Sequence, residues 1–125
     1  MTDNPSDRKY TSEHVWVRQQ DDGYLVGITD HAQNELGDIV FVEMPSIGDV
    51  ISQGQKFAVV ESVKTASEVY APIDGKIIAV NEEVDDSPEL INSDPYTQGW
   101  LVKLENSSAD IDRLLDASVY ADSVL

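Results

Sequence analysis

Short strand-like runs follow one another along most of this 125-residue chain, and turn signals separate them. The runs are rich in valine, isoleucine and aromatic residues, while glycine, aspartate and proline stand between them. A parallel pair of strands needs a crossover of about a dozen residues or more, usually a helix, and no such helix is evident before residue 107. The pattern therefore predicts an antiparallel sandwich or partly closed barrel, with strands at 14–19, 24–28, 39–44, 49–52, 56–62, 66–71, 76–80 and 99–105.

Two tight turns are expected between these strands. The segment QDDG, which ends at Gly23, joins the first two strands into a hairpin, because glycine accepts the backbone angles that such a turn requires. Asp74-Gly75 is a strong two-residue signal for a second hairpin. Other residues are interpreted as core or as turn and strand-end positions: Trp16 and Trp100 as core, and Pro72, Gly75 and Asn81 as support for the surrounding turns.

Short helices are predicted at three places. Residues 30–37 form the first, in which Asp30 caps the helix, Gln33 occupies the capping-box position and Gly37 ends it. A helical turn or two begins at SPELIN, with Ser87 as cap and Pro88 at the first helical position. From residue 107 onward the apolar spacing becomes helical, and its apolar face is made by Ile111, Leu114, Leu115 and Val119.

The length of the chain predicts a single domain. We divide it into an extension at 1–8, a β core at 9–106 and C-terminal helices at 107–125.

The charge of the chain restricts its partners. Twenty-four acidic residues against eight basic ones give a net charge of −16, so phosphates would be repelled. We expect no nucleic acid and no membrane as partner. The acidic excess indicates solubility, or alternatively a field that keeps the protein monomeric and steers it to basic partners.

Several kinds of site are disfavoured by what the chain lacks. It has no cysteine, hence no thiol nucleophile, and its two histidines, His14 and His31, show no metal-ligand spacing. No apolar run approaches the length of a membrane span. The first ten residues, MTDNPSDRKY, resemble neither a signal peptide nor a transit peptide. We expect a cytoplasmic protein of bacterial type, or the mature form of an organellar one.

Lys64 stands at the reversal between two strands, in the stretch VVESVKTASEVYAP. A tight primed turn favours Asn-Gly or Asp-Gly, and Val63-Lys64 suits it poorly. The pair is consistent with a more open turn that projects the lysine into water. Turn chemistry alone leaves two interpretations open: an ordinary solvated turn residue, or an amine displayed for modification.

Five segments of the chain resemble the glycine cleavage system H-protein family in the same order. They are EHVWV, VGITDHAQNELGDIVFVEMPSIGD, ESVKTAS, SPELINSDPYTQGW and LLDASVY, and they extend from about Lys9 to Tyr120. Related carriers differ at the hairpin, since biotinyl domains typically present Met-Lys-Met and acyltransferase lipoyl domains Asp-Lys-Ala. The resemblance implies a mainly β fold of the lipoyl/biotinyl type, a barrel-sandwich hybrid of two antiparallel sheets with short helices and a C-terminal helical tail.

The same resemblance implies a carrier without catalytic activity of its own. Lys64 would be joined by an amide bond to lipoic acid, which forms a swinging arm. The arm would accept the aminomethyl group of glycine from a pyridoxal-phosphate glycine decarboxylase. A tetrahydrofolate-dependent aminomethyltransferase and a dihydrolipoyl dehydrogenase would complete the cycle, and lipoate attachment enzymes would load Lys64.

The resemblance implies roles for residues around the hairpin, which are assigned position by position. Attachment enzymes would recognise the hairpin, and a cleft would shelter the loaded arm. The recognition residues are Glu61, Ser62, Val63, Ser67 and Glu68, and the cleft residues are Glu13, Val15, His31, Ser67 and Glu68. Three of them also have a plainer interpretation: Glu68 as a solvated strand residue, His31 as a first-turn helix residue and Ser67 as a backbone cap.

The chain departs from the family at Val15. The family usually reads His-Glu-Trp-Val, with a glutamate expected near the bound amine, and here the position is apolar. If Glu13 and Val15 share a strand they share a face, about 6.6 Å apart, which makes Glu13 the candidate to replace the missing carboxylate. Thr65 is a milder departure, since alanine is more usual there.

Two other functions stay open at this point. The chain could be an H-like protein that relays lipoyl groups to other lipoyl-dependent complexes, a role that needs no carboxylate for the amine. It could also be an unmodified interaction module, an alternative that the intact lysine hairpin disfavours.

Overall fold

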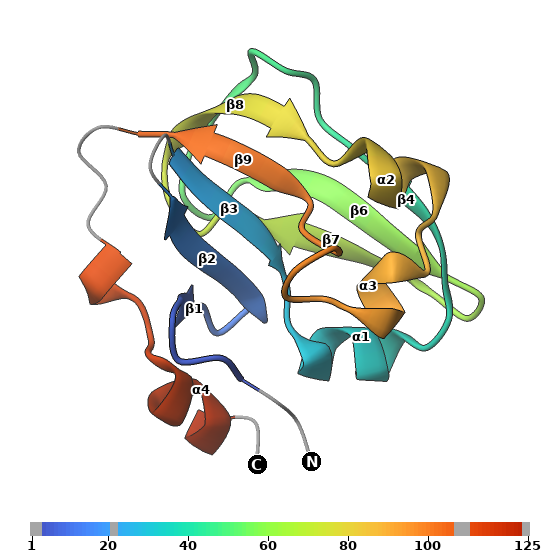
Figure 1. Ribbon diagram of the computed structural model, residues 1–125, viewed down its shortest axis with the longest axis horizontal. Helices are drawn as coiled ribbons and strands as arrows, with labels where there is room; N and C mark the ends of the chain where they lie inside the picture. Colours follow the sequence, from blue (N-terminus) through green and yellow to red (C-terminus); the bar gives the residue numbers. More distant parts are fainter. Residues whose placement is uncertain (1–3, 21–22, 107–110, 124–125) are drawn as a thin grey trace.

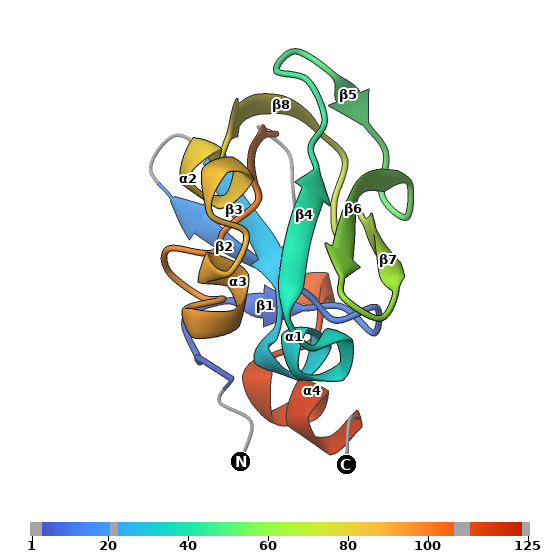
Figure 2. The same cartoon turned by 90° about the vertical axis from the view of Figure 1, so that its right-hand side faces the viewer.

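The computed structural model describes residues 4–20, 23–106 and 111–123, and their strands form two antiparallel sheets (Figures 1 and 2). One sheet has six strands in the order β1-β2-β3-β9-β8-β5, and the other has three in the order β4-β6-β7. The sheets do not close into a barrel, and the predicted mainly β fold with two antiparallel sheets is confirmed. The strands are β1 (Lys9–Tyr10), β2 (Val15–Gln20), β3 (Gly23–Ile28), β4 (Ile39–Glu43), β5 (Val50–Ile51), β6 (Lys56–Ser62), β7 (Ala66–Tyr70), β8 (Gly75–Val80) and β9 (Val102–Glu105).

The main hydrophobic core is formed by inward-facing side chains of both sheets. Val26, Ile77 and Leu104 of the larger sheet are fully buried, as is Val60 of the smaller one. A second cluster lies around Trp16, with Tyr10, Tyr96 and Tyr120. The predicted core position of Trp16 is confirmed, whereas Trp100 is only partly buried against this second cluster.

The first predicted hairpin is confirmed, because β2 and β3 pair in register from Val15 opposite Ile28 to Gln20 opposite Gly23. Helix α1 (Asp30–Leu36) follows directly. Its cap is Thr29 rather than Asp30, which corrects the sequence prediction. Thr29 has an extended backbone and its hydroxyl accepts from the Ala32 amide, while the Asp30 carboxylate accepts from the Gln33 side chain instead. Gly37 ends the helix, as predicted.

The hairpin predicted at Asp74-Gly75 is wrong. Strands β7 and β8 lie in different sheets, and β8 pairs with β5 and β9. The chain crosses between the sheets at 71–73, where the Ala71 backbone is hydrogen bonded to both Gly54 and Gln55. The Asp74 carboxylate accepts a hydrogen bond from the Gln53 amide at 2.6 Å, so the local turn signal serves a longer connection.

One helix was not predicted, and another begins later than expected. Helix α2 (Glu82–Asp86) starts at Asn81, whose side chain accepts from the Glu83 amide and donates to two backbone carbonyls. The prediction that Asn81 shapes the end of a strand is confirmed in this form. Helix α3 (Leu90–Ser93) begins after a turn in which the Ser87 carbonyl accepts from Leu90, so Ser87 and Pro88 precede the helix.

The C-terminal part is helical but interrupted. A 3-10 turn, η1 (Ile111–Arg113), is followed by Leu115, which exchanges two backbone hydrogen bonds with Tyr10, and then by α4 (Ala117–Ser123). The predicted apolar face is therefore wrong at Val119, which is 49% exposed, and Tyr120 is buried in its place. Part of the predicted helix, 107–110 and 124–125, lies outside the described residues. No helix in the described ranges is long and apolar enough to span a membrane.

Candidate functional site

Lys64 lies in an exposed turn that its neighbours shape through Ser62. Strands β6 and β7 pair as far as Glu61 and Ala66, and the Ser62 amide donates to the Thr65 carbonyl at 2.7 Å. The Ser62 hydroxyl oxygen also lies 3.3 Å and 3.2 Å from the amides of Lys64 and Thr65, which donate to it. Neither Val63 nor Lys64 has a positive φ, so this is not a primed turn, as predicted.

The turn displays both of its central side chains. Val63 is 71% exposed and Lys64 is exposed as well. The amide of Val63 donates to the Asp38 carbonyl, which ties the turn to the loop after α1. The stem of Lys64 passes over Gly37, where an added β-carbon would lie 3.8 Å from the lysine Cε. The lysine is thus presented to solvent from a backbone that is fixed on both sides.

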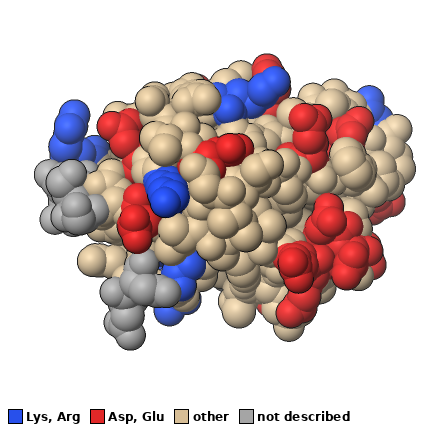
Figure 3. All heavy atoms as spheres, turned by 90° about the horizontal axis from the view of Figure 1, so that it is seen from above, with Lys and Arg blue, Asp and Glu red and all other residues tan. Residues whose placement is uncertain are grey.

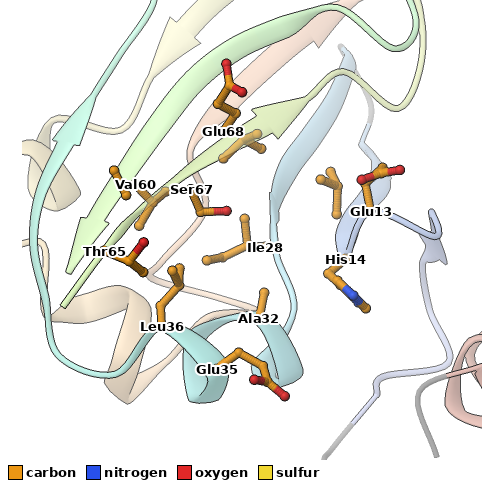
Figure 4. A pocket seen from close by; sticks show the side chains of 13 residues that line it. Glu13, His14, Ile28, Ala32, Glu35, Leu36, Val60, Thr65, Ser67 and Glu68 are labelled. Atoms are coloured by element: carbon orange, nitrogen blue, oxygen red, sulfur yellow. The ribbon is translucent and has the colours of Figure 1, made fainter.

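A cleft of about 320 Å³ opens beside this turn, between α1, the β6–β7 hairpin and the start of β2 (Figure 4). It begins at Thr65, next to Lys64, and its floor is apolar. A volume of this size falls at the lower end of the range for small-ligand pockets. The floor residues are Val15, Ile28, Ala32, Leu36, Val60 and Val69, and the polar residues are Glu13, His14, Glu35, Thr65, Ser67 and Glu68.

The cleft carries negative charge. Three glutamates line it, from the segment before β2, from α1 and from β7, and none of the lining residues is a lysine or arginine. The chain as a whole is acidic, with a net charge of −16, and the face seen in Figure 3 carries acidic side chains in groups. A group with a positive end is therefore favoured in this cleft over an anion.

The structure brings four of the five predicted cleft residues together. Glu13, Val15, Ser67 and Glu68 all line the cleft. His31 does not line it, and its ring instead lies 4.7 Å from that of His14, with Nε2 3.7 Å from a Glu35 oxygen. The remaining hairpin residues predicted for recognition, Glu61, Ser62 and Val63, form the end of β6 and the turn itself.

Glu13 and Val15 both line the cleft, but the prediction that they share one strand is wrong. Strand β2 begins at Val15, and His14 has φ 66°, so the alternation of a strand does not extend back to Glu13. Val15 is 1% exposed and belongs to the apolar floor. Glu13 is exposed at the mouth, where Figure 4 shows it on the same side as His14.

Glu68 already has partners. One carboxylate oxygen lies 3.5 Å from the Lys56 ammonium, and the other accepts from the Tyr70 hydroxyl at 3.3 Å. The negative charge of Glu68 raises the pKa of Tyr70. Because the ion pair is half exposed, it contributes little and can open easily. Glu13 has no ion pair among the described residues, so its carboxylate is the less engaged of the two.

Two cleft residues were missed by sequence reasoning. His14 lines the cleft with its Nδ1 2.8 Å from the Tyr120 hydroxyl, and burial, followed by the charge of His31, lowers the pKa of its imidazole. No local signal indicates its position, because a positive φ outside glycine is rarely visible in a sequence. Glu35 could have been found, since it lies four residues after His31 on one helix face.

The arrangement can hold a flexible, mostly apolar chain that is attached at Lys64 and ends in a cation. The apolar floor would cover the stem, and the carboxylates at the mouth would face the charged end. No group of three or more histidine, aspartate or glutamate side chains in the described ranges is placed to hold a metal ion.

Comparisons with known proteins agree on one family. The family model described as "Glycine cleavage H-protein" matches residues 8–124. A glycine cleavage system H protein of Enterobacter sp. (strain 638) is 53% identical over 123 residues, covering 97% of this chain and 95% of that protein. One of Klebsiella pneumoniae subsp. pneumoniae is 54% identical over 122 residues, covering 96% and 95%. The crystal structure of a glycine cleavage system H protein from Mycobacterium marinum matches with a TM-score of 0.89 and 40% identity, over 96% of this chain and 98% of that one.

Proposed function

The chain belongs to the glycine cleavage H-protein family, the non-catalytic lipoyl carriers of the glycine cleavage system, and from this premise we propose that Lys64 carries lipoic acid through an amide bond. The observation that supports this assignment is the position of Lys64. It lies on an exposed turn, beside a cleft of about 320 Å³ with an apolar floor. The residues present therefore fit the group that the family carries.

The physical chemistry of the attachment agrees with this cleft. Amide formation removes the positive charge of Lys64, so the lysine stem becomes less hydrated and packs more readily on apolar surface. When bound, the lipoyl group supplies the disulfide that receives the aminomethyl group of glycine and delivers it to the folate-dependent enzyme. The chain's own contribution is to display the lysine, shelter the arm from water and face its amine with carboxylates.

Individual residues take roles according to their places. Glu13 and Glu68 would bind the amine at the mouth, and Ser67 would line the path between them and the hairpin. His31 would act through its contact with His14 rather than by touching the arm. Val15 would give the arm an apolar surface, which leaves Glu13 as the carboxylate on the β2 side.

The partners follow from the same assignment. They are a pyridoxal-phosphate glycine decarboxylase, a tetrahydrofolate-dependent aminomethyltransferase, a dihydrolipoyl dehydrogenase and the enzymes that attach lipoate. The attachment enzymes would recognise the hairpin through Glu61, Ser62, Val63, Ser67 and Glu68. We place the protein in the bacterial cytoplasm as a monomer, since the relatives are bacterial proteins and a net charge of −16 opposes self-association.

The attachment is tested by mass spectrometry of protein produced in a host that attaches lipoate. We expect one lipoyl group, located on the peptide that contains Lys64, and none after Lys64→Arg. The matched control is Lys56→Arg, which changes another exposed lysine of the same hairpin and should leave lipoylation intact. A wild-type protein that stays unmodified would contradict the carrier assignment.

A second measurement separates the glycine carrier from a relay of lipoyl groups. The relay alternative is favoured by Val15, because such a role needs no carboxylate at that position. Lipoylated protein should support glycine–bicarbonate exchange with the cognate glycine decarboxylase. Lipoylation without exchange would instead support the relay.

A further inference from the structure

We propose that Tyr120 is a positioning residue that fixes the two walls of the arm cleft from outside it. The proposal deepens the assignment above, since it rests on the cleft being the place where the arm of Lys64 is held. Tyr120 belongs to α4 and does not line the cleft. Its side chain is fully buried, and its hydroxyl contacts one residue from each wall.

The first wall is the segment that leads into β2. There the Tyr120 hydroxyl oxygen lies 2.8 Å from Nδ1 of His14, a residue that lines the cleft between Glu13 and Val15. His14 is the one non-glycine residue with a positive φ, 66°, in the described part of the chain. A backbone of this kind persists only where surrounding contacts hold it, and the bond to Tyr120 is such a contact.

The second wall is helix α1. The same hydroxyl lies 2.7 Å from Oγ1 of Thr29, which is fully buried and caps the helix through the Ala32 amide. Helix α1 supplies Ala32, Glu35 and Leu36 to the cleft. One oxygen atom of the C-terminal helix therefore joins the β2 side of the cleft to the α1 side.

The Tyr120 hydroxyl bridges His14 and Thr29, and the two hydrogen bonds of this bridge can form with either tautomer of the His14 ring. With a lone pair on His14 Nδ1, the tyrosine hydroxyl donates to His14 and accepts from Thr29. With a proton on Nδ1, the tyrosine oxygen accepts from His14 and donates its own proton to Thr29, whose oxygen still accepts from Ala32. The bridge therefore holds the walls whichever nitrogen of His14 carries the proton.

Tyr120 is itself held rigidly. Its ring stacks on Tyr10 with centroids 4.9 Å apart and an angle of 11° between the planes. Backbone hydrogen bonds between Tyr10 and Leu115 fix the segment that precedes α4. Figure 2 shows α4 below α1, at the end of the molecule away from β5 and β8. The hydroxyl is thus presented from a fixed point, as a positioning role requires.

The contact of Tyr120 with His14 also affects the mouth of the cleft. The His14 ring lies against the His31 ring, and His31 Nε2 faces the Glu35 carboxylate at 3.7 Å. A displacement of His14 would therefore also change the environment of Glu35, because the two walls meet directly where the His14 ring lies against His31 of α1. Loss of the Tyr120 hydroxyl should widen or loosen the mouth while the ring still fills its place.

The test is Tyr120→Phe, which removes the hydroxyl and keeps the stacking ring. The matched control is Tyr24→Phe, a buried tyrosine of β3 that does not line the cleft. On the unlipoylated protein, nitrogen-15 resonances of the His14 ring and amide exchange at Ala32 and Gln33 are measured. We expect Tyr120→Phe to shift the Nδ1 resonance and to speed exchange at both amides, and Tyr24→Phe to change neither.

The lipoylated protein gives the functional measurement. After loading with the aminomethyl group, release of ammonia should be about fivefold faster in Tyr120→Phe, a factor that corresponds to the net energy of about one hydrogen bond, because the two lost bonds act on the arm only indirectly. Unchanged His14 resonances, or shifted resonances with unchanged release, would overturn the proposal. Absence of lipoylation in the wild type would contradict the carrier assignment alone, since the resonances are measured without the arm. If Tyr120→Phe does not fold, His14→Asn removes the same bridge from the other side and should give the same increase in release.

Discussion

The indole ring of Trp16 lies against Gly27 on the paired strand, so closely that a β-carbon at position 27 would come within 2.7 Å of two ring carbons. Trp16 is fully buried and forms the centre of the second core cluster, where the guanidinium of Arg8 lies 4.6 Å from its ring centroid. The indole nitrogen donates to the Pro95 carbonyl at 3.1 Å. The missing side chain at Gly27 is therefore the space that the indole fills.

Gly27→Ala should lower the free energy of unfolding by about 2–3 kcal/mol, because the added methyl forces the indole out of its rotamer and away from Pro95. Urea unfolding gives the stability, and near-ultraviolet circular dichroism reports the tryptophan. Gly48→Ala is the control: its φ of 99° strains an alanine, but no atom lies within 4 Å of the new carbon. It should cost about 1 kcal/mol and leave the tryptophan signal unchanged. An equal effect of the two variants would contradict the steric explanation.

Asn81→Asp should be strongly destabilising at neutral pH. The Asn81 amide donates to the carbonyls of Gln98 and Trp100, both at 2.8 Å, and the side chain is buried. A carboxylate would face two carbonyl oxygens without a proton to donate, at a cost of about 3 kcal/mol. Urea unfolding at pH 7.5 and pH 4 measures this cost, which should decrease at the lower pH as the new carboxyl becomes protonated.

The control for this variant is Asn34→Asp, the same change at an exposed position of α1. It should alter stability by no more than about 0.5 kcal/mol. If Asn34→Asp were as costly as Asn81→Asp, the added negative charge would be responsible rather than the two lost hydrogen bonds.

Val15→Glu should lower the stability of the protein and slow the loss of the aminomethyl group from the loaded arm. Val15 is 1% exposed in the cleft floor, so a carboxylate there loses its hydration and the fold loses about 2–3 kcal/mol. Release of ammonia from the loaded, lipoylated protein should become slower, since a carboxylate then faces the amine from the β2 wall. Val15→Gln separates size from charge: it should also destabilise the protein but leave release unchanged. If Val15→Glu also leaves release unchanged, Glu13, Glu68 or the apolar floor already suffices.

The stability of the protein should decrease in mild acid through His14. Burial, and then the charge of His31, hold the pKa of His14 below its ordinary value of 6.5, against the opposing effects of Glu13 and Glu35. The unfolded chain therefore binds the proton more tightly than the folded one, and acidification favours unfolding. The contribution is complete above pH 6.5, declines as the pH falls to the lower pKa of the folded state, and is constant below it.

Urea unfolding of wild type and His14→Asn between pH 7.5 and pH 5 tests this dependence. Asparagine is the natural comparison because it tolerates a positive φ and does not titrate in this range. The difference in stability between wild type and variant should shrink as the pH falls from 6.5. A difference that stays constant, or increases toward acid pH, would contradict a lowered pKa of His14.

Most of the fold could be predicted from the sequence because its signals are local. Alternating apolar runs located the strands, and the poor fit of Val63-Lys64 to a primed turn indicated the open turn that the structure shows. The hairpin signal at Asp74-Gly75 failed because the partner of a strand is chosen by long-range packing. β8 pairs with β5 and β9, which no signal within the turn itself can indicate.

The candidate site was only partly predictable for a similar reason. Val15, Ser67 and Glu68 were located through family resemblance, and Glu13 through a strand spacing to Val15 that the structure contradicts, yet all four line one cleft. His14 and Tyr120 were missed in this role, because 106 residues separate them and their contact depends on the backbone turning at His14. The helical spacing after residue 107 indicated a helix but not the extended segment at Leu115, which exists only because Tyr10 pairs with it.

At the Lys64 turn, the groups that determine the backbone shape are different from the side chains that are displayed to partners. The hydrogen bonds that form the turn come from the Ser62 hydroxyl and from backbone groups, and the side chains of residues 63 and 64 take no part in them. Mutation can therefore explore both positions without rebuilding the backbone, and selection can tune recognition by partner enzymes independently of folding. For protein engineering, position 64 is a ready attachment point, where a residue with a different reactive group could carry a synthetic tether beside the same cleft.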